Sequence, residues 1–148
     1  MAASTEVLAF QRIKSVEDFN TALQQSSAAG KTVMLDFYAD WCTYCIKMED
    51  NTFSDARVQQ ALSNVTVLQA DVTANDAADQ ALLKRFDVFG PPTIIFFDYN
   101  GKEIIRIDSV VQYYRLWGVL DYVNKEAYLT EPDYQAWRLK QRKTGESG

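Results

Sequence analysis

The fold of this chain is decided by residues 36–45, which read DFYADWCTYC. The segment begins in an apolar run typical of a strand and ends in a pattern typical of a helix. Both cysteines of the protein, Cys42 and Cys45, lie at this change. Two cysteines with this spacing near a strand-to-helix junction indicate a dithiol that opens and closes as a disulfide. The alternative is a pair of inert side chains, because buried cysteine often packs as a small hydrophobe.

The spacing also predicts a different role for each thiol. A helix that starts at about Trp41 or Cys42 places Cys42 at its positive end, where unpaired amides and the macrodipole favour a thiolate. We therefore expect Cys42 to be the attacking nucleophile. Cys45 lies three residues later, on the same helix face. It could attack the Cys42 sulfur and release a bound substrate thiol.

Two carboxylates flank the cysteines. Asp36 stands within the apolar run 33–39, and burial would raise its pKa enough to let it exchange a proton with Cys45 near neutral pH. Glu49 follows Cys45 by four residues, on the same helix face, and could share this task. The alternatives are a strand-edge charge facing water for Asp36 and an ordinary solvated helix residue for Glu49.

Together with a second motif, these residues resemble a known family. Trp41 and the cysteines follow the strand with Asp36, and Gly90-Pro91-Pro92-Thr93 precedes another apolar run. The combination resembles thioredoxin. It is most similar to the C-terminal periplasmic domains of the DsbD family of thiol:disulfide interchange proteins. That likeness covers roughly residues 10–107, and it depends on the segments 33–36, 38–42, 48–49, 52–55 and 72–76.

The resemblance implies a fold and a set of site residues. The fold would be the α/β thioredoxin fold, a central mixed sheet flanked by helices. Substrate would bind against Trp41, Pro91, Pro92 and Thr93, with Pro92 cis and facing the disulfide. No cofactor is implied, because the dithiol itself would carry the two electrons. Many thioredoxins have a lysine near the buried aspartate where this chain has Gln69, and losing that cation would raise the Asp36 pKa further.

The resemblance also implies an activity, although its direction stays open. The expected function is reduction of partner-protein disulfides by dithiol exchange, with protein thiols and disulfides as partners. A membrane electron donor and periplasmic redox proteins are the candidates among them. Thr43 and Tyr44 replace the Gly-Pro of many thioredoxins, so an oxidase or isomerase remains an alternative. Another is a non-catalytic thioredoxin-fold interaction module. The expected compartment is the periplasm, with the cytoplasm as the alternative.

Composition excludes several other classes of function. The 148 residues contain no histidine, which excludes histidine-dependent triads and histidine-rich metal sites. Two thiolates alone cannot complete a tetrahedral zinc site. A net charge of −5 argues against a nucleic-acid surface. No apolar segment is long enough to cross a membrane, and no signal-peptide pattern opens the chain. We expect a monomer, either an excised domain or a free-standing relative.

The rest of the sequence predicts the order of elements. Ser15 should cap a helix that stops near Gly30, and Ser54-Asp55 should cap another. The turn at 98–101 reads as a hairpin. The expected strands are 7–13, 32–39, 65–71, 93–97 and 103–107, and the expected helices are 16–29, 42–52, 56–62, 75–85 and one within 112–124.

The end of the chain departs from a minimal thioredoxin. We expect one domain over residues 1–148, with a core of about 7–124 and a helical extension at about 125–143. Thr130-Glu131-Pro132 reads as a helix start with proline in the first turn, followed by Tyr134, Trp137 and Leu139. This helix either covers the fold or helps to dock a partner. Residues 145–148 are expected to be disordered.

Overall fold

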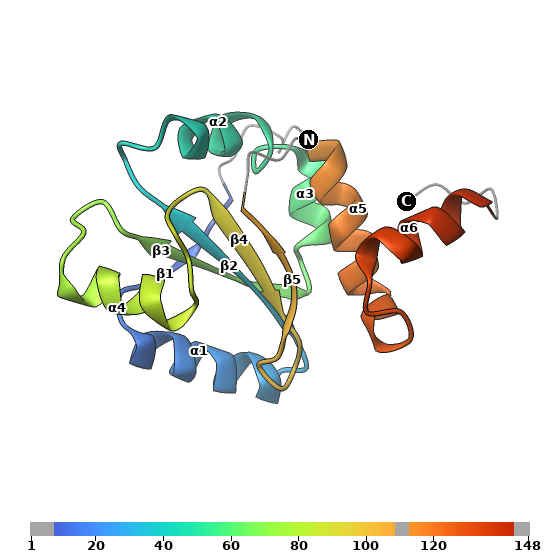
Figure 1. The fold of residues 1–148 in the computed structure, drawn as a ribbon, viewed down its shortest axis with the longest axis horizontal. Helices are drawn as coiled ribbons and strands as arrows, with labels where there is room; N and C mark the ends of the chain where they lie inside the picture. The colour runs from blue at the N-terminus through green and yellow to red at the C-terminus, as the bar shows by residue number, and fades with distance from the viewer. Residues whose placement is uncertain (1–7, 109–112, 144–148) are drawn as a thin grey trace.

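The computed structural model describes residues 8–108 and 113–143 of the chain (Figure 1). The expectation of disorder at 145–148 therefore lies outside the described residues. The strands are β1 (Gln11–Ile13), β2 (Thr32–Tyr38), β3 (Val65–Asp71), β4 (Thr93–Phe97) and β5 (Glu103–Ile107). The helices are α1 (Val16–Ala28), α2 (Thr43–Asn51), α3 (Ala56–Ala61), α4 (Ala77–Arg85), α5 (Tyr113–Asn124), the short 3-10 turn η2 (Ala127–Leu129) and α6 (Tyr134–Lys143).

The strands form one mixed sheet in the order β1-β3-β2-β4-β5. The first three strands of the chain run parallel to one another, whereas β4 and β5 are antiparallel to their neighbours. The central strand β2 is buried along its whole length, which explains its nearly continuous apolar sequence. The expected thioredoxin-type mixed sheet is confirmed, but β1 is shorter than the predicted 7–13 strand.

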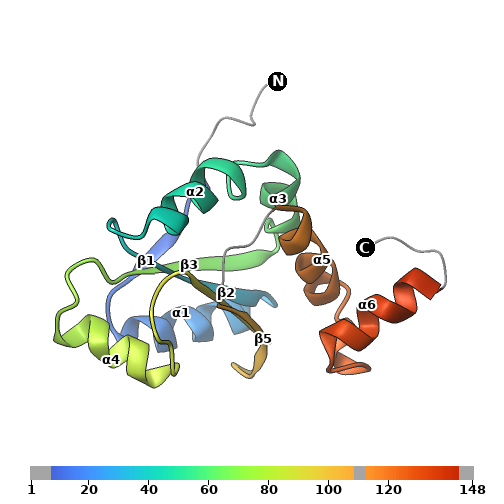
Figure 2. The same cartoon turned by 45° about the horizontal axis from the view of Figure 1, so that its top comes forward.

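Helices cover both faces of the sheet (Figures 1 and 2), with α1 and α4 on one side and α3 and α5 on the other. Side chains alternate along β2 as the pleat requires. Leu35 packs with Phe19 of α1 and Leu82 of α4. Met34, one residue earlier, packs with Met48 of α2 and with α3 and α5. Asp36 shares the pleat side of Met34, so its side chain lies beneath α2.

Local capping fixes where the helices begin. Ser15 and Asp18 form a capping box at α1, and Asp55 accepts hydrogen bonds from the first amides of α3. A second capping box, with Asp76 as N-cap, starts α4 at Ala77, two residues later than the predicted start. The hairpin turn is confirmed: Gly101 has a φ of 83°, a conformation that glycine adopts without strain.

The extra C-terminal helix is present, but its predicted start is wrong. Helix α6 begins at Tyr134 because the Asp133 carboxylate accepts hydrogen bonds from the amides of Gln135 and Ala136. Thr130 lies before that cap. Trp137 is buried, with its ring centroid 5.3 Å from that of Tyr122 in α5. Leu139, two positions further along the helix, is 53% exposed.

Candidate active site: a disulfide above two linked carboxylates

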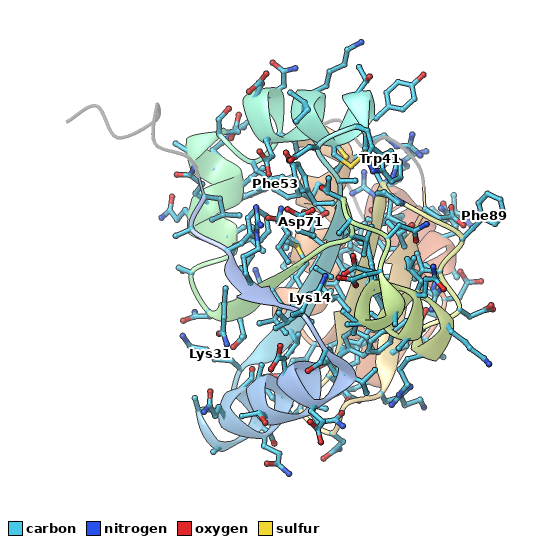
Figure 3. The ribbon with its side chains drawn as sticks, turned by 90° about the vertical axis from the view of Figure 1, so that its left-hand side faces the viewer. Lys14, Lys31, Trp41, Phe53, Asp71 and Phe89 are labelled. Atoms are coloured by element: carbon cyan, nitrogen blue, oxygen red, sulfur yellow. A yellow bond between two sulfur atoms is a disulfide. The ribbon has the colours of Figure 1, made fainter. Side chains whose placement is uncertain are left out.

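Cys42 and Cys45 form a disulfide at the start of α2. Figure 3 shows this bond beside Trp41. Cys42 is the N-cap residue, and its sulfur accepts a hydrogen bond from the Cys45 amide at 3.2 Å. Both residues are almost buried, at 6% and 5% exposure, so burial does not distinguish them. Their positions on the helix do, because only Cys42 occupies the positive end.

The second sulfur lies against the central strand. The Cys45 Sγ is 3.9 Å from the carbonyl oxygen of Phe37, the residue that follows Asp36 in β2. The strand therefore positions the inner sulfur and the buried carboxylate through adjacent residues. Within the described residues, no hydrogen bond joins Asp36 to Cys45 directly.

Asp36 carries an unusual charge environment. The residue is 5% exposed, and its pKa is raised from 3.8 to about 7. Desolvation is the main cause, and the nearby Glu49 charge acts in the same direction. A hydrogen bond from Gln69 and the charge of Arg12 oppose the shift. This direction agrees with the sequence-based expectation.

The Gln69 amide links the two carboxylates. Its Nε2 donates to Asp36 Oδ2 at 2.9 Å and lies 3.3 Å from Glu49 Oε2. The register of the parallel strands explains the first contact, because Asp36 of β2 is paired with Gln69 of β3. Glu49 reaches the same amide from α2 and is half-buried. The Gln69 amide thus brings together the two predicted carboxylates, Asp36 and Glu49.

Arg12, on the edge strand β1, holds the other end of the Gln69 amide. Its Nε donates to Gln69 Oε1 at 2.6 Å, and its Nη1 donates to Asp71 Oδ2 at 3.0 Å. The guanidinium also lies 5.6 Å from the centroid of the Tyr38 ring. The sequence did not single out Arg12, because its partners are 57 and 59 positions away.

Thr73, just after β3, holds the loop that carries Trp41. The Thr73 hydroxyl donates to Asp71 and accepts a hydrogen bond from the Asp40 amide at 2.8 Å. Its carbonyl accepts from Trp41 Nε1 at 3.2 Å. Trp41 remains 61% exposed. The indole ring is therefore oriented at the surface by a contact across 32 positions of sequence.

A cleft of about 560 Å³ lies beside Trp41. Its lining includes the predicted residues Pro91, Pro92 and Thr93, and the peptide bond between the two prolines is cis, as expected. Phe89 also lines the cleft and is fully exposed. Figure 3 shows its ring at the margin of the molecule.

Phe89 was missed by the sequence reasoning. Its neighbour Val88 is buried, and Arg106 donates hydrogen bonds to the carbonyls of Phe86 and Asp87 at 2.7 and 2.9 Å. These contacts hold the loop while Phe89 points outward. An aromatic residue directly before the Gly-Pro-Pro motif was the available signal.

The part of the chain that the structure describes also bears on metal binding and membrane insertion. Within it, no group of three or more histidine, cysteine, aspartate or glutamate side chains could hold a metal ion. None of its helices combines the length and apolar character needed to cross a bilayer.

Residues 19–124 match a family model described as a thioredoxin-like domain. The chain is 58% identical over 94 residues to the thiol:disulfide interchange protein DsbD of Ralstonia nicotianae. It is 56% identical over 96 residues to the protein of that name from Escherichia coli K12. These alignments cover 64% and 65% of the chain but only 16% and 17% of the relatives.

Solved structures are also similar to this chain, at lower sequence identity. The oxidised DsbD C-terminal domain of Neisseria meningitidis has a TM-score of 0.65 and 28% identity, covering 78% of this chain and 98% of that domain. A thioredoxin from Thermus thermophilus also has a TM-score of 0.65, with 25% identity, covering 82% and 93% of the two chains.

Proposed function

Because the chain belongs to the thioredoxin-like domain family, we propose that it is a thiol:disulfide oxidoreductase that reduces disulfides of partner proteins. The observation that carries this proposal is the Cys42–Cys45 disulfide at the first turn of α2. The interchange proteins named DsbD, whose sequences match this chain, support the same chemistry. No cofactor is needed, because the dithiol holds both electrons.

The reaction would proceed in two exchange steps. The Cys42 thiolate attacks one sulfur of the partner disulfide, so that a mixed disulfide forms and the first partner thiolate leaves. Cys45 then loses its proton and attacks the Cys42 sulfur. The mixed disulfide breaks, the second partner thiolate leaves, and both leaving groups take up protons. The dithiol is oxidised to a disulfide while the partner disulfide is reduced to two thiols.

Helix α2 would favour the first step. The Cys45 amide that lies 3.2 Å from the Cys42 sulfur in the disulfide can donate to the thiolate after reduction. A hydrogen bond to an ionised sulfur is stronger than one to a neutral group. The same amide therefore stabilises Cys42 as nucleophile and as leaving group.

Asp36 and Glu49 would manage the proton of the second step. The pKa of about 7 leaves Asp36 able to accept a proton and return it near neutrality. Since no hydrogen bond joins Asp36 to Cys45 among the described residues, a water molecule is the proposed carrier between them. Glu49 would assist through the Gln69 amide that both carboxylates share.

Trp41, Pro91, Pro92 and Thr93 would bind the partner segment in the neighbouring cleft. The partners we propose are protein thiols and disulfides, with a membrane electron donor and periplasmic redox proteins as the specific candidates. The proposed compartment is the periplasm, and the proposed state is a monomer.

The first test is the reduction potential of the Cys42–Cys45 pair, measured by equilibration in graded thiol buffers. A value near −270 mV, at the thioredoxin end of the scale, would support a reductant. A value near −120 mV would overturn the direction and indicate an oxidase.

The second test uses cysteine variants. Cys45→Ala should accumulate mixed disulfides through Cys42 when reduced protein meets partner disulfides, because the resolving thiol is missing. The double variant Cys42→Ala, Cys45→Ala should be inactive. Full biological activity of the double variant would contradict the enzyme and favour an interaction module.

A further inference from the structure

Gln69 makes an unusual set of contacts for a buried amide. It is 1% exposed, and its single Nε2 group faces Asp36 at 2.9 Å and Glu49 at 3.3 Å. An amide nitrogen has two hydrogens to donate, so each carboxylate can receive one. Its Oε1 is turned the other way and accepts from Arg12.

Arg12 selects this orientation of the amide. If the amide were rotated by half a turn, Oε1 would face two carboxylates and Nε2 would face a guanidinium that cannot accept a hydrogen bond. Both sides would then lose their partners in a buried site, which is costly. The 2.6 Å contact from Arg12 Nε therefore fixes which end of Gln69 faces the carboxylates.

The guanidinium is itself held in place at the surface. Arg12 of β1 is the register partner of Gln69 of β3. Its Nη1 pairs with Asp71 at 3.0 Å, and its charge lies over the Tyr38 ring. The side chain is nevertheless 56% exposed. A substitution there can change the charge without opening the core.

We propose that Gln69 is a positioning residue that holds Asp36 and Glu49 side by side through one amide nitrogen, and that Arg12 sets the orientation in which it does so. This inference rests on the proposed function for its use in catalysis, because Asp36 would receive the Cys45 proton. The contacts themselves exist in the disulfide form and can be tested without turnover.

The surrounding charges bear on the protonation of Asp36. Asp36 faces Glu49 from α2 and Arg12 from β1, with Tyr38 and Asp71 as the next titratable groups around Arg12. Desolvation and the Glu49 charge favour the protonated form of Asp36, whereas the Gln69 hydrogen bond and Arg12 favour the ionised form. Ionised Asp36 would take up the Cys45 proton as the disulfide forms and release it to water afterwards.

The direct experiment follows the Asp36 and Glu49 carboxyl carbons by NMR during a pH titration of the oxidised protein. The variants are Arg12→Gln, Arg12→Lys and Gln69→Met. The matched control is Arg57→Gln, because Arg57 on α3 is also largely exposed, at 66% of its side chain. Arg12→Gln removes a surface charge, so it remains informative if Gln69→Met fails to fold.

We expect wild-type Asp36 to titrate near 7 and its midpoint to rise in both Gln69→Met and Arg12→Gln. The Asp36 midpoint should rise less in Arg12→Lys than in Arg12→Gln, because lysine keeps the positive charge but not the paired donors of the guanidinium. Arg57→Gln should leave the midpoint unchanged. In the Gln69→Met background, Arg12→Gln should have a smaller effect than in wild type, because Arg12 acts through Gln69. Equal effects of Arg12→Gln and Arg57→Gln would overturn the proposal.

A kinetic measurement separates this proposal from the proposed function. Reduced protein is mixed with dithiobis(nitrobenzoate), and release of the second nitrothiobenzoate reports attack by Cys45. In Arg12→Gln this phase should slow by roughly threefold to tenfold at pH 7, the scale of one ordinary hydrogen bond. Shifted NMR midpoints with no dithiol turnover would overturn the proposed enzyme activity but not the positioning role. Unshifted NMR midpoints with normal dithiol turnover would overturn the positioning role but not the enzyme activity.

Discussion

The backbone amide of Cys45 lies 3.2 Å from the sulfur of Cys42, so the inner cysteine donates a hydrogen bond to the outer one. The contact follows from the N-cap position of Cys42, whose sulfur and carbonyl oxygen both accept from the Cys45 amide, the oxygen at 3.1 Å. One residue of the pair thus carries the proposed resolving thiol and is also a backbone donor to the proposed attacking thiol.

The first prediction concerns this asymmetry. In reduced single variants, Cys42 of the Cys45→Ala protein should alkylate roughly tenfold faster at pH 7 than Cys45 of the Cys42→Ala protein, because its thiolate fraction is larger. Iodoacetamide labelling followed by mass spectrometry measures both rates. Faster labelling of Cys45 would reverse the two roles.

The second prediction concerns the cost of burying Asp36. Below about pH 4 its carboxyl is protonated in the folded and unfolded states, so it has no effect on stability. Between pH 4 and 7 the unfolded chain ionises while the folded chain keeps its proton. Stability therefore falls as pH rises through this window. A pKa of about 7 against 3.8 corresponds to a loss on the order of 4 kcal/mol.

Asp36→Asn should remove this loss, so the oxidised variant should gain several kcal/mol relative to wild type at pH 8 and little at pH 4. Urea unfolding at the two pH values measures the difference. Asp50→Asn, which changes an exposed carboxylate on α2, is the control. An equal effect of Asp36→Asn at both pH values would show that the buried carboxyl does not titrate in this range.

The third prediction concerns the C-terminal helix. Trp137→Ala should lower the free energy of unfolding by about 3 kcal/mol, because it leaves a cavity beside Tyr122. Leu139→Ala, two positions along the same helix, should change it by less than about 0.5 kcal/mol, since that side chain is 53% exposed. The reduction potential should be unchanged in both. A shifted potential in Trp137→Ala would mean that α6 influences the active site.

The fourth prediction concerns partner recognition. Phe89→Ala and Trp41→Ala should each lower kcat/KM for a protein disulfide by roughly fivefold to thirtyfold, as for an exposed aromatic anchor. The rate with a small disulfide should change little for Phe89→Ala, because Phe89 lies at the cleft margin rather than at the sulfurs. Leu139→Ala, an exposed apolar residue on α6, is the control. Equal losses with both substrates would assign Phe89 to the chemistry instead.

Much of the fold could be predicted because its signals are local. The strand-to-helix change at residues 36–45 identified the redox centre, and Ser15 and Asp55 identified two helix starts. The start of α6 was misread because Thr130 and Pro132 form a plausible cap. The side chain that reaches the first amides is that of Asp133.

The support of the site could not be predicted in the same way. Gln69 departs from the family pattern in the sequence, but nothing in the sequence indicates that its amide reaches two carboxylates. Those contacts depend on the pairing of β2 with β3 and on the packing of α2 above them. Arg12 depends on a further pairing, of β1 with β3. Phe89 carries an aromatic signal that is ordinarily read as core.

Strand β1 is three residues long and, within the described residues, pairs with β3 alone. Short edge strands open more readily than central ones, with local free energies below that of global unfolding. Each time β1 frays, the guanidinium that faces Gln69 leaves with it, and Asp36 loses a positive charge that lowers its pKa. The proton affinity of the buried Asp36 is thereby coupled to local opening of the edge strand β1. Hydrogen exchange of the β1 amides would then report on the redox centre from outside it.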